Sequence, residues 1–211
     1  MNSTTYSVQS GTTLTNAKVE KEGMIIVYSG GRTESTTVNS CNIAQYKGMF
    51  VSNGGVAANT YINNSGAVYV YSGGKLVGGT VSAGGYLYVN EKGIASDFVV
   101  QPGANVTIMS GASVYNLKDN GGNVYILDGA YVTFAQNVID SIVMNSDTYG
   151  VRSGTTLTNA TVGANGQIIV YDGGVVDTVL VNSCNAAGYK GLYVYSGGKV
   201  INTEIKSGGA F

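Results

Sequence analysis

The sequence predicts an all-β fold, a single-stranded right-handed parallel β-helix (β-solenoid) of about 19 residues per coil and about 10–11 coils. Three observations predict it: a long internal repeat, a shorter glycine repeat inside it, and apolar residues that alternate with polar ones between the glycines. Each coil of a solenoid packs only against its neighbours, so a regular repeat is sufficient to define the architecture.

The long repeat has an offset of 143 positions. Val8–Ala17 returns almost unchanged as Val151–Ala160, and the match runs without a gap from Met1 and Met144 to Ala67 and Ala210. A repeat of this length that contains shorter repeats is typical of stacked coils. We therefore expect one continuous solenoid over residues 1–211, in which residues 1–143 form a full super-repeat of seven coils and residues 144–211 form a partial second copy.

Glycines recur along the long repeat in two interleaved series. Because glycine adopts positive φ at little cost, each series indicates a row of tight turns, with an extended segment on either side. Each unit then has two turns and two strands. The first series runs through Gly11, Gly31, Gly55, Gly74, Gly93, Gly111, Gly129 and Gly154.

The step along this series is nearly constant. It is longest from Gly31 to Gly55 and from Gly129 to Gly154, where extra residues are inserted. Relative to the step from Gly55 to Gly74, the step to Gly31 is one position longer, and the steps to Gly111 and Gly129 are each one position shorter. Seven steps of this series fill the long repeat.

The extended segments alternate in polarity. Val68 and Val70 share one parity and Tyr69 and Tyr71 the other, which is the period of a half-buried strand. An antiparallel meander of hairpins is the alternative, but a near-constant step favours parallel coils, in which like residues stack. The intervening segments supply the opposite wall of the core, with Leu14, Val19, Val38, Ile62, Leu76, Val81, Phe98, Val100, Val114 and Leu117.

Composition excludes several classes of protein. Only 11% of residues are charged, the net charge is −1 and no basic patch stands out, so a nucleic-acid partner is not expected. The chain has no histidine, the commonest general base and metal ligand. No apolar run reaches the length of a membrane span, and residues 1–20 lack the apolar core of a signal peptide. An export signal would therefore lie outside this chain.

The acidic residues are scattered and do not recur at one place in adjacent coils. A polysaccharide-processing β-helix needs carboxylates that converge on one face. Calcium-binding repeats need aspartate at a fixed place after the glycines, and no phosphate-loop spacing is present. We therefore expect no catalytic site, no metal site and no cofactor.

Two insertions carry the only cysteines, at equivalent positions in the two copies. Coils stack about 4.8 Å apart, so seven coils separate Cys41 from Cys184 by roughly 34 Å. A disulfide spans about 7 Å at most, so two free thiols are expected. The insertions are either display loops for multivalent contact or tolerated insertions with the thiol packed inward. The candidate interaction residues are Cys41, Tyr46, Lys47, Cys184, Tyr189 and Lys190.

Tyrosines of one parity form a candidate aromatic face, composed of Tyr69, Tyr71, Tyr86 and Tyr88. Stacking between neighbouring coils would contribute about 0.2–1 kcal/mol per pair. The same side chains offer large contact area at low entropic cost, and so suit a binding surface for sugars or a partner rod. Stacking is the favoured interpretation, and the two are compatible.

The unit from Gly54 to Ser72 resembles the 19-residue strand-loop-strand repeat of AIDA-type autotransporter passenger domains. The Gly-Gly, Asn-Thr and Tyr-Val elements hold their relative places over nearly the whole chain outside the insertions. Asn59-Thr60 and Asn202-Thr203 fit the family pattern, whereas Gly79-Thr80 and Ser96-Asp97 depart from it.

This resemblance implies a non-catalytic passenger fragment, secreted or displayed on a Gram-negative cell surface, that serves in adhesion or self-association. Its partners would be a host-surface or glycan ligand, or other copies of itself. Some family members carry heptose on serine beside the Gly-Gly turn, which implies a glycosyltransferase partner. Ser29, Ser72, Ser196 and Ser207 match that context, although Asp172 replaces serine at the counterpart of Ser29. A glycosyltransferase acceptor and a polysaccharide-binding or processing β-helix are the alternatives.

Overall fold

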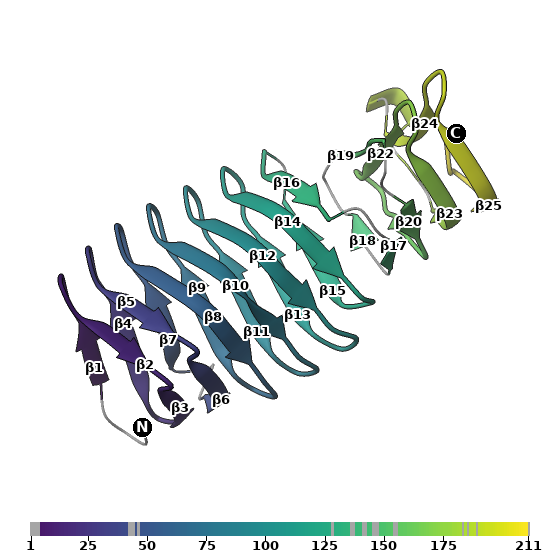
Figure 1. Cartoon of the computed structure of the whole chain (residues 1–211). Coiled ribbons are helices and arrows are strands. Elements are labelled where there is room, and N and C mark those ends of the chain that lie inside the picture. Colours follow the sequence, from purple (N-terminus) through teal and green to yellow (C-terminus); the bar gives the residue numbers. More distant parts are fainter. Residues whose placement is uncertain are drawn as a thin grey trace.

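The computed structural model describes residues 5–41, 45, 47–127, 129–135, 138–140, 143–144, 148–153, 156–182, 184, 186–188 and 190–210. Over these residues the chain is a β-solenoid, and every strand pair is parallel (Figure 1). The parallel stacking confirms the predicted fold and rejects the hairpin alternative. Like residues therefore lie above one another in successive coils.

One wall consists of four-residue strands. Their hydrogen-bonded order follows the chain, because each coil adds one strand beside the last. The first seven are β1 (Thr5–Val8), β4 (Met24–Val27), β7 (Gly48–Val51), β9 (Ala67–Val70), β11 (Tyr86–Val89), β13 (Asn105–Ile108) and β15 (Asn123–Ile126). A separate three-stranded sheet holds β19 (Thr148–Val151), β22 (Gln167–Val170) and β24 (Gly191–Val194).

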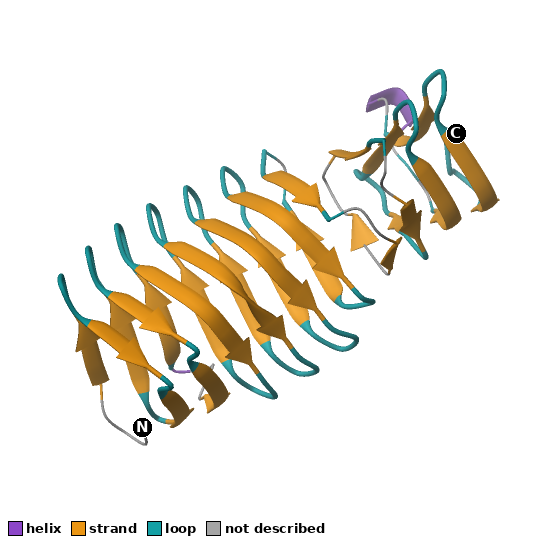
Figure 2. Ribbon diagram, in the orientation of Figure 1, coloured by secondary structure: helices purple, strands orange, loops and turns teal. Residues whose placement is uncertain are grey.

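The opposite wall consists of longer or paired short strands, which Figure 2 shows running across the molecule. Its nine-stranded sheet holds β2 (Thr13–Thr15), β3 (Lys18–Lys21), β5 (Arg32–Glu34), β6 (Thr37–Cys41), β8 (Val56–Ile62), β10 (Lys75–Val81), β12 (Ile94–Val100), β14 (Ser113–Asp119) and β16 (Tyr131–Phe134). A six-stranded sheet follows, with β17 (Val138–Asp140), β18 (Val143–Met144), β20 (Thr156–Thr158), β21 (Thr161–Val162), β23 (Val175–Val181) and β25 (Lys199–Ile205).

Each long strand is kinked at one residue with left-handed backbone. Asn59, Gly78, Asp97 and Asn116 occupy this position in consecutive coils, with φ between 49° and 71°. Asn and Asp tolerate this region better than other non-glycine residues. The kink shifts the alternation by one residue, so Ala95 and Phe98 both face the core although they are three apart. The left-handed residue explains the Asn of the Asn-Thr element, and Gly78 and Asp97 meet the same backbone requirement.

The core lies between the two walls. The predicted inner residues of both walls are buried, from Val19 and Val38 near the start to Val114 and Leu117 farther along, while Leu14 packs against the core at its edge. Phe98, Leu87 and Leu117 are among the largest side chains that are fully buried. Sequence parity thus identified the core correctly.

The strand register corrects the coil lengths. The pairings Thr13 with Arg32, Lys75 with Ile94 and Ile94 with Ser113 all join positions that are equally far apart in the chain. The coil from Arg32 to Val56 is longer because it carries the first insertion, and the coil from Ser113 to Tyr131 is one residue shorter. The long step to Gly31 and the short step to Gly111 in the glycine series are therefore not coil lengths, because each joins the first glycine position of one turn to the second position of another. The predicted length of about 19 residues per coil is confirmed.

The coils are joined by two rows of turns. We call the row after the four-residue strands the first turn edge and the row after the long strands the second turn edge; in Figure 1 they lie at opposite margins of the solenoid. Backbone hydrogen bonds connect successive turns, such as Gly54 N to Gly73 O at 2.9 Å and Gly84 N to Gly103 O at 2.8 Å. The turn edges are therefore ordered ladders.

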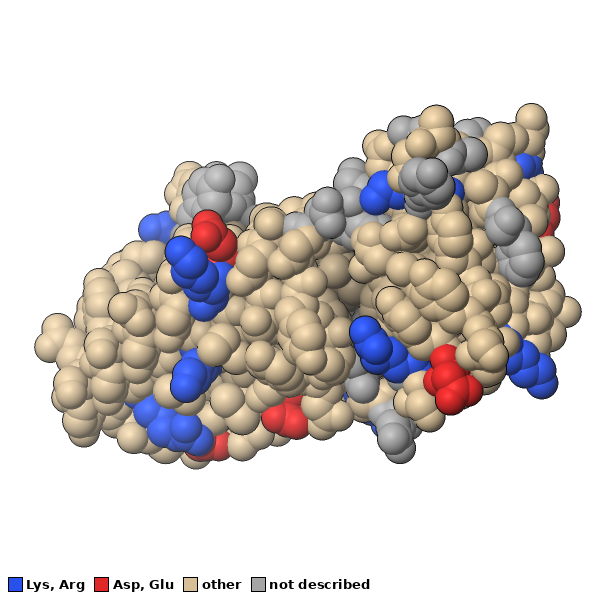
Figure 3. All heavy atoms as spheres, turned by 90° about the horizontal axis from the view of Figure 1, so that it is seen from above, with Lys and Arg blue, Asp and Glu red and all other residues tan. Residues whose placement is uncertain are grey.

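Helical structure is limited to short turns in the part of the chain that is described. A 3₁₀ helix, η2, spans Ala186–Gly188. Among the described residues, no helix is long and apolar enough to cross a membrane. Charged side chains are sparse on the face seen in Figure 3, in keeping with the composition.

Candidate functional site: outer face, turn edges and copy junction

Aromatic rings stack on the outside of the four-residue strands, at positions of the predicted aromatic face. Tyr69 stacks between Phe50, at 4.9 Å between ring centroids, and Tyr88, at 5.0 Å. The three rings are nearly parallel and occupy one column of the sheet, because Phe50 pairs with Tyr69 and Tyr69 with Tyr88. Sequence reasoning missed Phe50, which shares the Tyr69 parity in the insertion-bearing coil.

The stacking decides which tyrosines remain accessible. Tyr69 points outward yet is only 6% exposed, because its neighbours cover both ring faces. Tyr86 is half-buried beside Tyr88 at 6.5 Å, whereas Tyr71 is 40% exposed. Stacking between coils thus explains the low exposure of Tyr69, Tyr86 and Tyr88. Of the four predicted tyrosines, Tyr71 is the most exposed.

The four candidate serines do not share one edge. Ser29, Ser72 and Ser196 are exposed residues of the first turn edge, each followed by a glycine with positive φ. Ser207 is exposed as well, but its turn belongs to the second turn edge, where Cys184 N donates to Gly208 O at 2.7 Å. The Ser-Gly-Gly sequence is the same at both edges, so it cannot tell them apart.

The cysteines of the two insertions point toward the core. Both thiols are free. Cys41 is 6% exposed within the apolar core, and its burial raises the pKa of the thiol. Cys184 is half-buried, with Sγ 2.8 Å from the carbonyl oxygen of Asn182. Lys47 and Lys190 are half-buried, and Tyr46 and Tyr189 lie outside the described residues. For the thiols, this placement favours inward packing over display.

A carboxylate occupies a core position that sequence reasoning did not single out. Asp119 is fully buried and pairs in register with Val100, in the column that also holds Ile62 and Val81. Its Oδ1 accepts hydrogen bonds from Gly122 N at 2.8 Å and Gly121 N at 3.0 Å. This turn belongs to the coil that is one residue short. In the preceding coil the corresponding turn is closed by a backbone carbonyl, because Ala104 N donates to Gln101 O. In the shortened turn the Asp119 carboxylate replaces that carbonyl as the acceptor.

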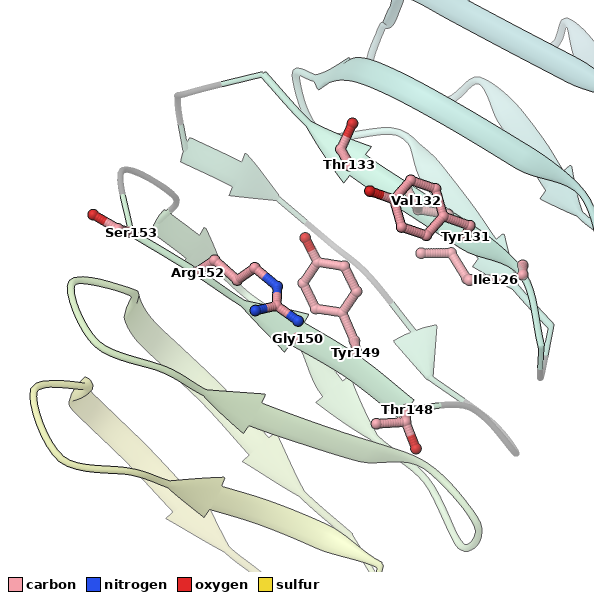
Figure 4. A pocket seen from close by; sticks show the side chains of 10 residues that line it. Ile126, Tyr131, Val132, Thr133, Thr148, Tyr149, Gly150, Arg152 and Ser153 are labelled. Atoms are coloured by element: carbon pink, nitrogen blue, oxygen red, sulfur yellow. The ribbon is translucent and has the colours of Figure 1, made fainter.

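The region between the two copies holds a cavity of about 380 Å³ (Figure 4). Its walls come from the end of the first copy, with Tyr131 and Val132, and from the start of the second, with Tyr149 and Arg152. Tyr149 occupies the inner column of β19 and is 5% exposed, whereas its counterpart Tyr6 is 42% exposed. The copy junction therefore converts an exposed position into a buried one.

Burial gives Tyr149 a pH-dependent contribution to stability. Desolvation first, and the negative charge of Asp119 second, raise the pKa of this hydroxyl well above its ordinary value. Above about pH 10 the unfolded chain loses this proton while the folded chain keeps it. The free energy of unfolding therefore falls with rising pH, by at most about 1.4 kcal/mol per pH unit from this group.

We expect the alkaline fall in stability to be shallower in Tyr149→Phe than in the parent chain. Urea unfolding between about pH 8 and 11 measures it. Cys41, whose pKa is also raised, contributes a fall of the same sign, but it is common to both proteins and cancels in the comparison. Equal slopes for the two proteins would contradict the assignment to Tyr149.

The described residues contain no group of three or more His, Cys, Asp or Glu side chains that could hold a metal ion. Amide and carboxylate side chains instead pair along the kinked strands. Asn116 donates to Asp97 at 2.7 Å, and this bond is the main cause of the lowered pKa of Asp97. Asn59 donates to Glu34 at 2.6 Å, with the same effect on the pKa of Glu34. These carboxylates lie on the outer surface of the solenoid, where each accepts a hydrogen bond from an asparagine of the next coil.

No protein-family model matches the chain, and no curated protein matches it. Among solved structures, the chain is similar to a TibA fragment, crystallised after hyper-glycosylation catalysed by TibC, at 24% identity and a TM-score of 0.48. The similarity covers 97% of this chain and 93% of the TibA fragment.

Proposed function

We propose that this chain is a non-catalytic repeat module of a larger autotransporter passenger, displayed on or released from a bacterial surface for adhesion or self-association. The observation that carries the proposal is the parallel strand register, which places equivalent outer positions above one another in successive coils. The resemblance of the repeat unit to AIDA-type passenger domains supports the same function.

The mechanism is avidity. A parallel solenoid repeats its outer features once per coil, about 4.8 Å apart, on a backbone that neighbouring coils hold by hydrogen bonds. Individually weak contacts to a host-surface ligand or to another copy then add up when many engage together. No single tight pocket is required.

The experiment uses beads coated with the full chain at graded densities. Adhesion of the beads to epithelial cells, or to one another, should rise more steeply than density, while free chain competes poorly. Beads that carry a globular protein of similar size and charge are the control. A module without adhesive function would leave coated and control beads indistinguishable at every density.

A second candidate function, acceptor of a glycosyltransferase, has its own observation. The first turn edge carries a column of exposed serines that includes Ser10, Ser29, Ser72, Ser110, Ser153 and Ser196. An enzyme that recognises one edge of the solenoid would find hydroxyl groups at the same place in these coils, interrupted by Asn53, Glu91 and Asp172. Ser207 lies on the other edge.

Intact mass of the chain from its native host tests this function. Regular increments of one heptose or hexose are expected, and Ser72→Ala should lose one increment whereas Ser207→Ala should lose none. An unmodified mass removes the acceptor function and leaves the adhesive one untouched.

A further inference from the structure

We propose that a groove at the first turn edge of the first three coils binds a neutral saccharide. The groove is shallow and widely open to the outside of the solenoid, with a volume of about 550 Å³. Its lining includes Gln9, Ser10, Tyr28, Ser29, Ser52 and Asn53. The proposal rests on the adhesive function above, for which it names a ligand class and a place.

The lining matches the chemistry of a sugar. It consists of uncharged hydroxyl and amide groups around one aromatic ring, that of Tyr28, which is 41% exposed. A sugar ring presents a C–H face that packs on an aromatic ring, and a rim of hydroxyls that exchange hydrogen bonds with such groups. Among the described residues, no charged side chain lines the groove to attract an anion, and no aliphatic side chain lines it to receive an apolar peptide.

The Tyr28 ring is exposed because its neighbours in the adjacent coils do not cover it. Tyr28 N donates to Val8 O and Ser52 N donates to Val27 O, so Gln9, Tyr28 and Ser52 follow one another in a single outer column. Serine is too small to cover the ring. Among the described residues no ring contact or cation–π contact involves Tyr28.

In the second copy, the chain's own side chains cover the corresponding tyrosine ring. Arg152, Tyr171 and Tyr195 stand where Gln9, Tyr28 and Ser52 stand in the first copy. The Arg152 guanidinium lies 4.5 Å from the Tyr171 ring centroid, and the Tyr195 ring lies 5.5 Å away on a tilted plane. The chain's own side chains thus occupy in the second copy the contacts that a sugar would make in the first.

A sugar could reach this groove from two sources, because Ser29 is also a candidate acceptor. A sugar attached to Ser29 Oγ would itself fill the space. The test therefore uses full chain made in a host without the glycosyltransferase, and its unmodified mass is checked first. Binding by that protein can only be binding of a free saccharide.

The probe is a glycan array that carries neutral, sialylated and sulfated oligosaccharides, followed by saturation-transfer NMR with the strongest neutral glycan. We expect neutral glycans to bind. Tyr28→Ala should weaken binding about tenfold, because the stacking surface and its hydroxyl are lost. The double variant Gln9→Arg/Ser52→Tyr, which installs the residues of the second copy, should abolish binding. Tyr171→Ala is the matched control and should not reduce the signal.

Three results would each overturn the proposal. They are absence of neutral-glycan binding, binding of acidic glycans alone, and full binding by a folded double variant. The double variant is expected to fold, because the second copy accommodates the same side chains. The bead experiment is independent of this test. Bead adhesion that survives Tyr28→Ala would support the adhesive function but not this groove. Saccharide binding without bead adhesion would support the groove and contradict the adhesive function.

Discussion

Replacement of Asp119 by alanine is expected to lower the free energy of unfolding by about 3–5 kcal/mol. The carboxylate is fully buried, and two backbone N–H groups, of Gly121 and Gly122, donate to one of its oxygens. A buried donor left without an acceptor costs about 1–3 kcal/mol, and alanine leaves the buried Gly122 N–H and the half-buried Gly121 N–H without one while it opens space in the core.

Asp119→Asn is the matched variant, because its amide oxygen can accept the same two hydrogen bonds. It should restore most of the loss. Asp119→Val would restore the apolar column of Val100 but not the acceptor, and should stay destabilised. Chemical unfolding gives the three free energies. A valine variant as stable as the parent would show that Asp119 serves some purpose other than the turn.

The loss should be local, because a solenoid transmits stability only between neighbouring coils. Hydrogen exchange in Asp119→Ala should rise first around Gly121 and Gly122 and in the strands beside them, β14 and β15. Exchange in β9, which β11 and β13 separate from β15, should change little. Uniform acceleration along the chain would instead indicate a single cooperative unit.

The fold was predictable because its signal repeats. Glycine turns, apolar parity and equal coil length each occur many times, so an irregularity at one place, such as the long step to Gly31, did not affect the prediction. The buried wall residues, from Val19 to Leu117, follow from parity alone. The kink did not have such a signal, because Asn59, Gly78 and Asp97 share only a tolerance of positive φ.

The site features depend on contacts between coils, which a single pass along the chain does not show. Tyr28 and Tyr171 are both exposed-parity tyrosines at equivalent positions, yet Ser52 or Tyr195, one coil farther on, decides whether the ring is open or covered. Asp119 looks like a surface acid until the one-residue shortening of its turn is known. Alignment of each coil by strand register, rather than by glycine, would have placed it in the core.

The second large effect is expected at Gly48, the residue at which the cysteine-bearing insertion rejoins the sheet. Its backbone has φ of 131°, and a Cβ built there would collide with the carbonyl oxygen of Ala67 in the next coil. Gly191, its counterpart in the second copy, has φ of 132°, and a Cβ there would meet the carbonyl oxygen of Ala210. Both copies therefore require glycine at this position for two reasons, the positive φ and the close approach of the next coil.

Gly48→Ala should lower the free energy of unfolding by about 2–5 kcal/mol, the sum of a disfavoured φ and a collision with backbone. The neighbouring carbonyl belongs to a hydrogen-bonded strand and cannot rotate away. Gly54→Ala is the control, since it makes the same chemical change in the unfolded chain. There φ is 73°, and the nearest atom is Oγ of Ser29, a side chain that can rotate, so about 1–2 kcal/mol is expected.

The comparison tests the two causes together. A φ of 131° is essentially restricted to glycine, whereas a φ of 73° lies close to the left-handed region that other residues tolerate, so strain and collision both make Gly48→Ala the more costly change. We expect Gly48→Ala and Gly191→Ala both to exceed Gly54→Ala in urea unfolding, and equal destabilisation would contradict both causes. Glycine at the end of each insertion is then required because the chain must enter the sheet directly beneath the next coil, which leaves no room for a side chain.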